Sequence, residues 1–210
     1  MGFFITFEGI EGCGKTTQAE MLKDYFEWKG REVVSVREPG GTELGERVRA
    51  ILVSVEGEGL DYWAELFLYE ACRAQLVKDV IKPSLEEGKI VICDRYKDST
   101  LGYQGYGRGL DMGAVTSVNE WASAGVEPNL TFLMDCSPEE GLKRAWHRIG
   151  SAELKEDRFE KEAVEFHASV RKGFLELAGK EPQRIRVVKG EGEIEAIHKE
   201  ICGIIEKAGV

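Results

Sequence analysis

The sequence predicts an α/β fold, in which a parallel sheet is covered by helices on both faces. Short apolar runs alternate along the whole chain with segments that have the apolar spacing of amphipathic helices. These runs are nearly continuous rather than interleaved with polar residues, which is typical of strands buried on both sides. The chain has 210 residues, 42% of them hydrophobic and 31% charged, and this suits a single domain spanning residues 1–210.

Five apolar runs predict the strands of this sheet. Each is five or six residues long, which is an ordinary strand length. The runs are FFITF at 3–7, EVVSV at 32–36, KIVICD at 89–94, LTFLMD at 130–135 and RIRVV at 184–188.

Helices are predicted between and after these strands. The first ends at Gly30, the region at about 61–86 is kinked or restarts at Pro83, and residues 112–124 form another. Residues 137–140, SPEE, are a helix start, because they combine a capping box with a proline at the first helical position. Four helical faces are marked by apolar residues: Ala19, Leu22, Tyr25 and Phe26; Leu44, Val48, Ile51, Leu52 and Val55; Val115, Val118 and Trp121; Ile194, Ile197, Ile201 and Ile205.

Two segments lack this regularity. Residues 149–158, IGSAELKEDR, are charged and have no clear period, so we expect a mobile lid within about 144–160. Residues 99–109, STLGYQGYGRG, are polar and rich in glycine, so we expect a loop over the sheet edge.

Charge and cysteine usage exclude several classes of function. The net charge of −10 argues against nonspecific nucleic-acid binding, so an anionic substrate would need locally concentrated arginines. The five cysteines are scattered without a C-x-x-C pair, which favours a reducing cytoplasm over a disulfide framework or a zinc site. No stretch is long enough to span a bilayer, so we expect no membrane contact.

Residues 9–16, GIEGCGKT, match the phosphate-binding pattern G-x-x-x-x-G-K-[ST] between a strand and a helix. In such a loop the backbone N–H groups surround a phosphate, Lys15 bridges the β- and γ-phosphates, and Thr16 ligates Mg²⁺. The loop alone leaves GTPases, ATP-driven motors and small-molecule kinases open. Glu11 is unexpected here, because it places a carboxylate inside a loop that binds anions.

A second binding region is predicted at the end of the third strand. Asp94 and Arg95 lie at its carboxyl end, where ligands bind in open α/β sheets. Asp94 could hold Mg²⁺ through water, and Arg95 could grip a second phosphate with two N–H groups. Tyr69 and Arg73 are one helical turn apart and could hold a planar base, although the ordinary reading is Tyr69 in the core and Arg73 in solvent.

The chain resembles the thymidylate kinases, in the form whose catalytic arginine lies in the lid. The resemblance rests on FEGIEGCGKTTQ, REPGGTELGERVR, the RAQ of 73–75, CDRYKDSTLGYQGYGRGL and SPEEGLKRAWHR, which occur in the family's order. It implies a P-loop nucleoside monophosphate kinase fold and Mg²⁺-assisted transfer of the γ-phosphoryl group of ATP to dTMP. It also implies a homodimer.

The resemblance assigns roles to individual residues. The ATP-binding residues are Gly9, Glu11, Gly12, Cys13, Gly14, Lys15, Thr16, Thr17 and Arg144. The dTMP-binding residues are Glu11, Glu38, Arg49, Tyr69, Arg73, Arg95, Thr100, Tyr103 and Gln104, with Tyr69 where relatives carry phenylalanine. The catalytic residues are Glu11, Lys15, Arg95 and Arg148, and the metal is held by Thr16 and, through water, by Asp94.

The residues of the phosphate loop affect which roles are expected for the lid arginines and for Glu11. The phosphate loop lacks the arginine of other family members, so Arg148 is expected to supply the transition-state cation, with Arg144 and Arg158 as alternatives. Glu11 is expected to turn away from the phosphates toward the acceptor nucleotide.

Two other functions stay open at this point. One is a related kinase for another pyrimidine monophosphate or for a deoxynucleoside. The other is a nucleotide-operated switch, although neither Asn119 nor Asn129 is followed by the lysine of a guanine-binding N-K-x-D motif.

Overall fold

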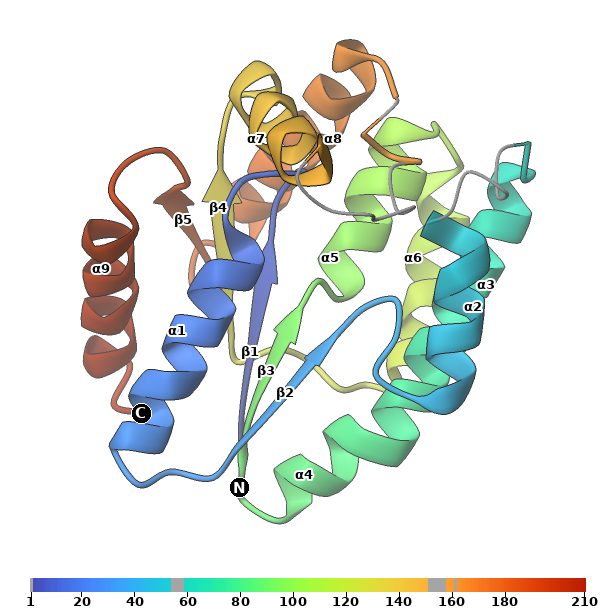
Figure 1. The fold of residues 1–210 in the computed structure, drawn as a ribbon. Coiled ribbons are helices and arrows are strands. Elements are labelled where there is room, and N and C mark those ends of the chain that lie inside the picture. Colours follow the sequence, from blue (N-terminus) through green and yellow to red (C-terminus); the bar gives the residue numbers. More distant parts are fainter. Residues whose placement is uncertain (1, 54–58, 151–157, 161) are drawn as a thin grey trace.

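The computed structural model describes residues 2–53, 59–150, 158–160 and 162–210. Its centre is a five-stranded parallel sheet with the strand order β2-β3-β1-β4-β5 (Figure 1). The strands are β1 (Phe3–Glu8), β2 (Val33–Arg37), β3 (Ile90–Asp94), β4 (Leu130–Asp135) and β5 (Ile185–Lys189). All five predicted strands are confirmed to within one residue at each end, because continuous burial gives a strand an unambiguous sequence pattern.

Helices cover both faces of the sheet (Figure 1). On one face, α1 (Lys15–Trp28) and α9 (Ile194–Lys207) pack on a core that includes Phe7 and Phe132. The other face is covered by two clusters of buried side chains, one from the α3 region and one from α8. The remaining helices are α2 (Glu43–Val53), α3 (Tyr62–Leu76), α4 (Lys82–Glu86), α5 (Lys97–Thr100), α6 (Met112–Ser123), α7 (Pro138–Gly150) and α8 (Val164–Lys180).

The long helical region predicted at 61–86 is interrupted where it was expected to be. A π-helical segment, η2 (Val77–Ile81), follows α3, and the α-helix restarts at Lys82 with Pro83 in its first turn. Proline is tolerated there, because its missing N–H would have no partner within the helix. Val55, predicted to lie on the face of the second helix, is outside the described residues.

The expectation of a glycine-rich loop at 99–109 was wrong. The segment is helical, since α5 leads directly into a second π-helical segment, η3 (Leu101–Gly107). Its glycines allow close packing on α8: a Cβ at Gly102 would lie 3.3 Å from the ring of Phe174, and one at Gly107 would lie 2.7 Å from the ring of Phe166. Tertiary packing therefore outweighs the low helix propensity of glycine. Helix α8 itself was not predicted.

The lid expected at about 144–160 falls largely outside the described residues. Helix α7 extends to Gly150, and residues 158–160 lie beside the cavity described below. In the described part of the chain, no helix is long and apolar enough to cross a membrane.

Candidate active site

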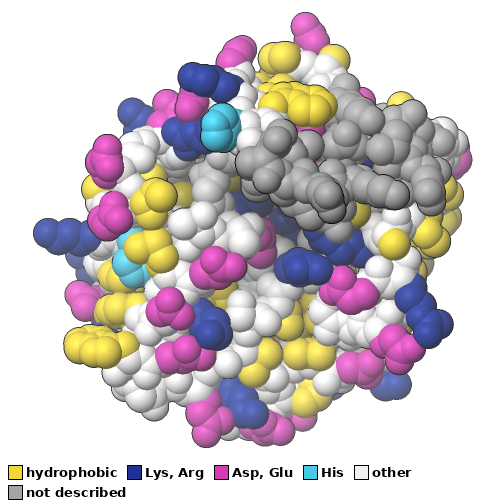
Figure 2. Space-filling model, viewed as in Figure 1, with side chains coloured by type: hydrophobic (Ala, Val, Ile, Leu, Met, Phe, Trp, Pro, Cys, Tyr) yellow, Lys and Arg dark blue, Asp and Glu magenta, His cyan; other side chains and the backbone are white. Residues whose placement is uncertain are grey.

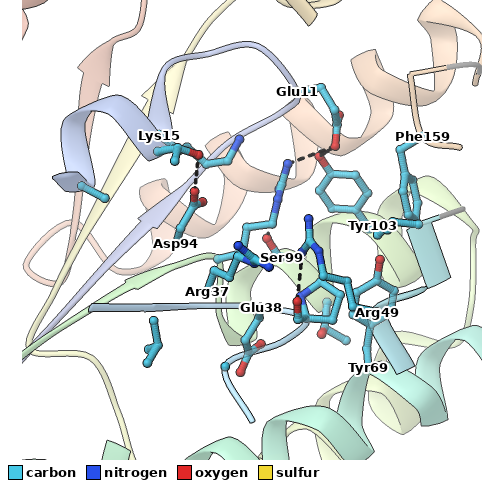
Figure 3. Close-up of a pocket in the computed structure, with 18 of the residues that line it drawn as sticks. Glu11, Lys15, Arg37, Glu38, Arg49, Tyr69, Asp94, Ser99, Tyr103 and Phe159 are labelled. Carbon is cyan, nitrogen blue, oxygen red and sulfur yellow. Dashed lines mark hydrogen bonds and ion pairs between the residues drawn. The ribbon is translucent and has the colours of Figure 1, made fainter. Parts of the chain in front are cut away.

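A cavity of about 610 Å³ opens at the carboxyl edge of the sheet. It is lined by the phosphate loop, the turn after β2, helix α3, the segment after β3 and residues 158–160 (Figure 3). Figure 2 shows basic side chains in the hollow at the centre of this face, within a surface where acidic and basic groups are mixed. The carboxyl ends of β2 and β3 and the loop after β1 meet here, at the edge where ligands bind in an open α/β sheet.

The phosphate loop connects β1 to α1. Gly9, Gly12 and Gly14 have φ angles of 135°, 69° and 92°, which side chains with a Cβ rarely adopt. Lys15 folds back onto the loop, where its Nζ donates to the carbonyl oxygen of Ile10 at 2.6 Å. The lysine is therefore held by a neutral acceptor that a phosphate could replace.

Two oxygen groups at the base of this loop fit a divalent cation. The Thr16 hydroxyl donates to Asp94 Oδ2 at 2.5 Å, so a hydroxyl and a carboxylate oxygen meet beside the loop. Oxygen ligands of this kind are those that Mg²⁺ prefers. The two residues predicted as metal ligands are thus brought together, although they are 78 positions apart.

The loop also touches the backbone of α7. A Cβ at Gly12 would lie 1.9 Å from the carbonyl oxygen of Gly141, and a Cβ at Gly141 would lie 2.5 Å from that of Glu11. Both distances are far below a van der Waals contact, so neither glycine leaves room for a side chain.

Arg95 reaches the cavity from an unusual backbone conformation. Its φ of 68° is in the left-handed region, and such a conformation costs a non-glycine residue about 1 kcal/mol. The turn is held by Glu8, which accepts hydrogen bonds from the backbone N–H of Tyr96 at 2.8 Å and the hydroxyl of Ser99 at 2.5 Å. The Arg95 guanidinium donates to Gly9 O at 2.9 Å and to Glu11 Oε1 at 3.0 Å.

Glu11 points its carboxylate toward the hydroxyl of Tyr103 (Figure 3). Its Oε1 accepts hydrogen bonds from Arg95 and, at 2.6 Å, from the hydroxyl of Tyr103. Burial raises the pKa of this carboxyl, but Arg95, His167 and Lys15 outweigh burial and hold it well below the ordinary range of a glutamate. The buried acid is therefore ionised and is balanced by cations.

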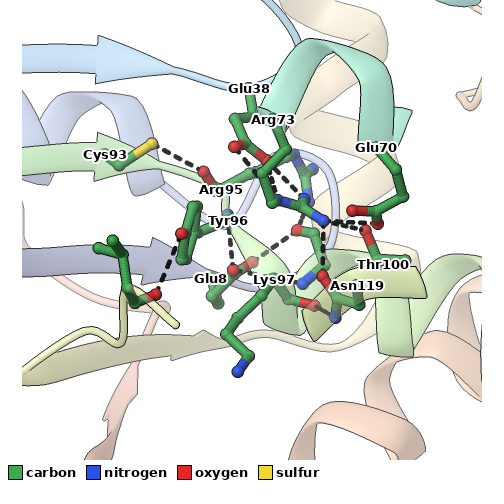
Figure 4. Close-up of polar contacts among 12 residues, drawn as sticks. Glu8, Glu38, Glu70, Arg73, Cys93, Arg95, Tyr96, Lys97, Thr100 and Asn119 are labelled. Atoms are coloured by element: carbon green, nitrogen blue, oxygen red, sulfur yellow. Dashed lines mark hydrogen bonds and ion pairs between the residues drawn. The ribbon is translucent and has the colours of Figure 1, made fainter. Parts of the chain in front are cut away.

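Arg73 is the most completely enclosed cation of the site (Figure 4). Its Nη1 donates to Glu70 at 2.6 Å, Asn119 at 2.7 Å and Thr100 at 2.9 Å. Its Nε and Nη2 donate to Glu38. The ordinary reading of this helix face is reversed, because Arg73 is buried while Tyr69 is half-buried and lines the cavity.

The surplus of carboxylates around Arg73 affects Glu38. Burial raises the pKa of Glu38, Arg73 lowers it and Glu70 raises it again, which leaves it at about 7. Glu38 is therefore poised to exchange a proton or to accept another cation near neutral pH.

A sequence model of the thymidylate kinase family matches residues 7–201. The chain belongs to the thymidylate kinase family. The thymidylate kinase of Geotalea uraniireducens is 46% identical over 206 residues, which are 98% of this chain and 97% of that protein. The thymidylate kinase of Citrifermentans bemidjiense is 50% identical over 195 residues, covering 92% and 87% of the two proteins. The crystal structure of thymidylate kinase from Ehrlichia chaffeensis matches with a TM-score of 0.80 at 38% identity, covering 97% of this chain and 98% of that one.

Most residues that the family resemblance assigned to substrates lie at the cavity. Those that line it are Glu11, Gly12, Lys15, Thr16, Glu38, Arg49, Tyr69, Arg73, Asp94, Arg95, Thr100, Tyr103 and Gln104. The others are Gly9, Cys13 and Gly14 within the phosphate loop, Thr17 on the exposed side of α1, and Arg144. Family membership thus agrees with a site that brings five separate chain segments together.

The three arginines predicted for the lid have different surroundings. Arg144 spans from α7 to the turn after β5, where it donates to the carbonyl oxygen of Gly190 at 2.8 Å. Arg158 is buried, forms an ion pair with Glu65 and donates to Leu52 O at 2.9 Å. The backbone of Arg148 belongs to α7, but its side chain lies outside the described part of the chain.

The sequence analysis did not identify Glu65, which joins α3 to η3 and to residues 158–160. This fully buried carboxylate accepts hydrogen bonds from Gln104 at 2.8 Å and from Arg108 at 3.3 Å, in addition to Arg158. Glu65 lies one helical turn before Tyr69 on the same face of α3. The spacing of one helical turn between Glu65 and Tyr69 was the signal in the sequence that could have identified Glu65.

Proposed function

We propose that this protein phosphorylates dTMP to dTDP with ATP as the phosphoryl donor, a step in the synthesis of dTTP. Membership of the thymidylate kinase family supports this reaction. The arrangement of Arg95 and Tyr69 supports its location at this cavity. Arg95 donates to Gly9 O of the phosphate loop, and Arg95 and the half-buried Tyr69 line the same cavity, so a nucleotide with its base on Tyr69 can place its phosphate beside the loop. An acceptor oxygen of dTMP then attacks the γ-phosphorus, and the bond to the β-phosphate oxygen breaks with its electron pair leaving on ADP.

The donor side of the proposed reaction uses the phosphate loop. Its N–H groups and Lys15 hold the triphosphate, and Thr16 with Asp94 would hold Mg²⁺, Asp94 through water. When bound, this ion neutralises charge on the phosphates. The protein's part is to align donor and acceptor and to exclude water.

The acceptor side uses residues from four segments. Arg95 and Arg49 bind the dTMP phosphate, and Tyr69 stacks on the thymine ring. Arg73, Thr100 and Gln104 recognise the base edge, while Glu38 serves the acceptor and the metal. Tyr103 crowds the 2′ position of the sugar, which discriminates against a ribose hydroxyl by about 1–3 kcal/mol.

Arg148 supplies the transition-state cation in this proposal, with Arg144 assisting from the same helix. Arg148→Ala is expected to lower kcat by about 10³-fold, as for other transition-state arginines. A nearly unchanged kcat would transfer the role to Arg144 or Arg158.

The proposed assembly is a homodimer that packs through exposed apolar side chains on neighbouring helices. Trp63 and Phe67 of α3 lie side by side, with ring centroids 6.2 Å apart, and Phe67 is 54% exposed. Ile51 of α2 and Trp121 of α6 are also exposed, on helices that pack against α3. Sedimentation velocity would test the dimer. A cytoplasmic location stays a prediction from the scattered cysteines.

The decisive assay uses purified protein with ATP, Mg²⁺ and one nucleoside monophosphate at a time. We expect the highest kcat/KM with dTMP and weak activity with dUMP. Activity with dTMP no greater than with AMP, CMP and GMP would refute the proposal. Phosphorylation of a free deoxynucleoside in preference to dTMP would instead support the alternative acceptor class.

A further inference from the structure

His167 is a buried histidine of α8 that lies between the phosphate loop and residues 158–160. Its side chain has no exposure to solvent. Nε2 lies 3.0 Å from the carbonyl oxygen of Phe159, and Nδ1 lies 3.1 Å from Glu11 Oε2. The imidazole therefore joins Glu11 and Phe159, which are 148 residues apart in the sequence.

Both neighbours of the ring nitrogens are acceptors, and this restricts where the protons can be. A backbone carbonyl oxygen cannot donate, so Nε2 needs a proton to bond Phe159. In the neutral form with that proton, the lone pair of Nδ1 faces the Glu11 carboxylate. The other neutral tautomer places a lone pair against the Phe159 carbonyl oxygen instead.

A protonated Glu11 could donate to the lone pair of Nδ1, but this carboxyl is held ionised by the cations around it. Neither Nδ1 of His167 nor Oε2 of Glu11 has a hydrogen-bond partner elsewhere among the described residues. The 3.1 Å between these two atoms is a close contact between a carboxylate and the ring, and it is favourable when the ring is charged.

We propose that His167 is an imidazolium that positions Glu11, binding Glu11 through Nδ1 and the 158–160 segment through Nε2. The two oxygens of Glu11 then have different cations, Arg95 at Oε1 and His167 at Oε2. The kinetic consequence rests on the proposed function. When Arg95 turns to the acceptor phosphate, His167 continues to neutralise the buried carboxylate and to hold its orientation.

The surroundings of this pair are defined on every side. Arg95 reaches Glu11 from the end of β3, the Tyr103 hydroxyl reaches it from η3, and Lys15 adds positive charge from α1. On its own helix, the His167 ring is 5.4 Å from that of Phe166 at 88°, an edge contact without charge. The only carboxylate described in contact with His167 is Glu11.

Nitrogen NMR of the free protein tests the protonation state directly. The chain has three histidines, so a protein labelled with ¹⁵N in its histidine rings gives three resolvable patterns. We expect both ring nitrogens of His167 to be protonated in the folded protein at about pH 7. His198 should be neutral there, since burial lowers its pKa. One protonated and one unprotonated nitrogen in His167 would overturn the inference.

Two variants connect this state to Glu11 and assign the signals. His167→Gln removes one pattern, and Glu11→Gln should convert the His167 pattern to that of a neutral ring, because the carboxylate is gone. A His167 pattern unchanged in folded Glu11→Gln protein would show that Glu11 does not hold the proton, and would overturn the proposal.

Kinetics tests the positioning role. His167→Gln has one donor group and cannot serve both acceptors, so we expect KM for dTMP to rise about tenfold with a smaller loss of kcat. The matched control, His198→Gln on α9, should leave both within about twofold. Unchanged KM in folded His167→Gln protein would refute the role. Absence of dTMP phosphorylation in the unmodified protein would refute the proposed function alone, since the NMR result does not depend on substrate.

Discussion

Two arginines that line one cavity have contrasting surroundings. Arg73 has a side chain only 1% exposed and is in contact with two carboxylates, Glu38 and Glu70 (Figure 4). Arg95 is 19% exposed and has one carboxylate contact among the described residues, that of Glu11. The charge of the first guanidinium is balanced by two carboxylates of the protein, whereas the second keeps capacity for a phosphate.

The difference shows how a protein with a net charge of −10 can bind anions. Around Arg73, carboxylates outnumber the guanidinium, so a phosphate would be repelled. Around Arg95, Lys15 adds positive charge near Glu11, and the Arg95 side chain keeps some exposure. In the proposed reaction, this difference favours a nucleotide whose phosphate lies beside Arg95.

The largest effect is expected for Arg73→Ala, through stability. Removing the guanidinium leaves Glu38 and Glu70 buried without their cation, which should lower the free energy of unfolding by about 3–5 kcal/mol. Urea denaturation followed by circular dichroism measures this. The matched control is Arg47→Ala, whose ion pair with Glu43 is exposed and should contribute less than about 1 kcal/mol. Equal losses in the two variants would contradict the contrast.

The next effect is expected for Arg95→Ala, through catalysis. Loss of its guanidinium should lower kcat/KM for dTMP by about 10²-fold, with a raised KM and slower turnover. Steady-state assays with varied dTMP measure this, and Arg47→Ala again serves as the control. An unchanged KM would contradict the phosphate role and would make Arg95 resemble Arg73.

A smaller effect is expected at Tyr69, which lines the same cavity as the two arginines. Tyr69→Ala should weaken dTMP binding by about 1–3 kcal/mol, since stacking of a base on an aromatic ring has this magnitude. Tyr69→Phe keeps the ring and should bind within about twofold of the unmodified protein. Isothermal titration with dTMP compares the three. A loss of similar size in Tyr69→Phe would assign the contribution to the hydroxyl rather than to stacking.

The smallest effect is expected in the pH dependence of stability. Burial and the charge of Asp98 raise the pKa of Glu8 to about 8, and burial raises that of Glu38 to about 7. Each native carboxyl binds its proton more tightly than the unfolded one, whose pKa is about 4.5. The stability from this difference is complete below about pH 4.5 and is lost as pH rises through about 7 and 8.

Glu8→Gln isolates one part of this dependence. Its amide oxygen can still accept the hydrogen bond from Tyr96, so we expect a folded protein whose stability falls less steeply between about pH 7 and pH 8. Unfolding free energies measured across this range test it. An identical slope in the variant would show that Glu8 does not titrate there.

The sheet could be predicted because each strand is buried on both faces and its pattern is local. The phosphate loop could be predicted because one ligand, a phosphate, dictates its glycines and its lysine. The prediction of a loop at 99–109 was wrong, because the glycines of this segment allow packing against α8 rather than a turn. No pattern within nearby residues encodes such a contact.

The buried polar groups of the site were the hardest to predict. Tyr69 and Arg73 were correctly placed on one helix face, but their burial depends on Glu38 and Glu70, which the helix spacing does not reveal. No pattern in the sequence singles out His167. Its partners come from segments distant in the sequence, so only the folded chain brings a donor and two acceptors together.

The contact of Gly12 with Gly141 has an evolutionary consequence. An overpacked pair in an ordinary core can be rescued when the partner mutates to a smaller residue. Here the obstacle to a side chain at either position is a backbone carbonyl oxygen, which no substitution removes. A mutation at one glycine therefore cannot be compensated by a mutation at the other. A side chain at either position would require helix α7 to move.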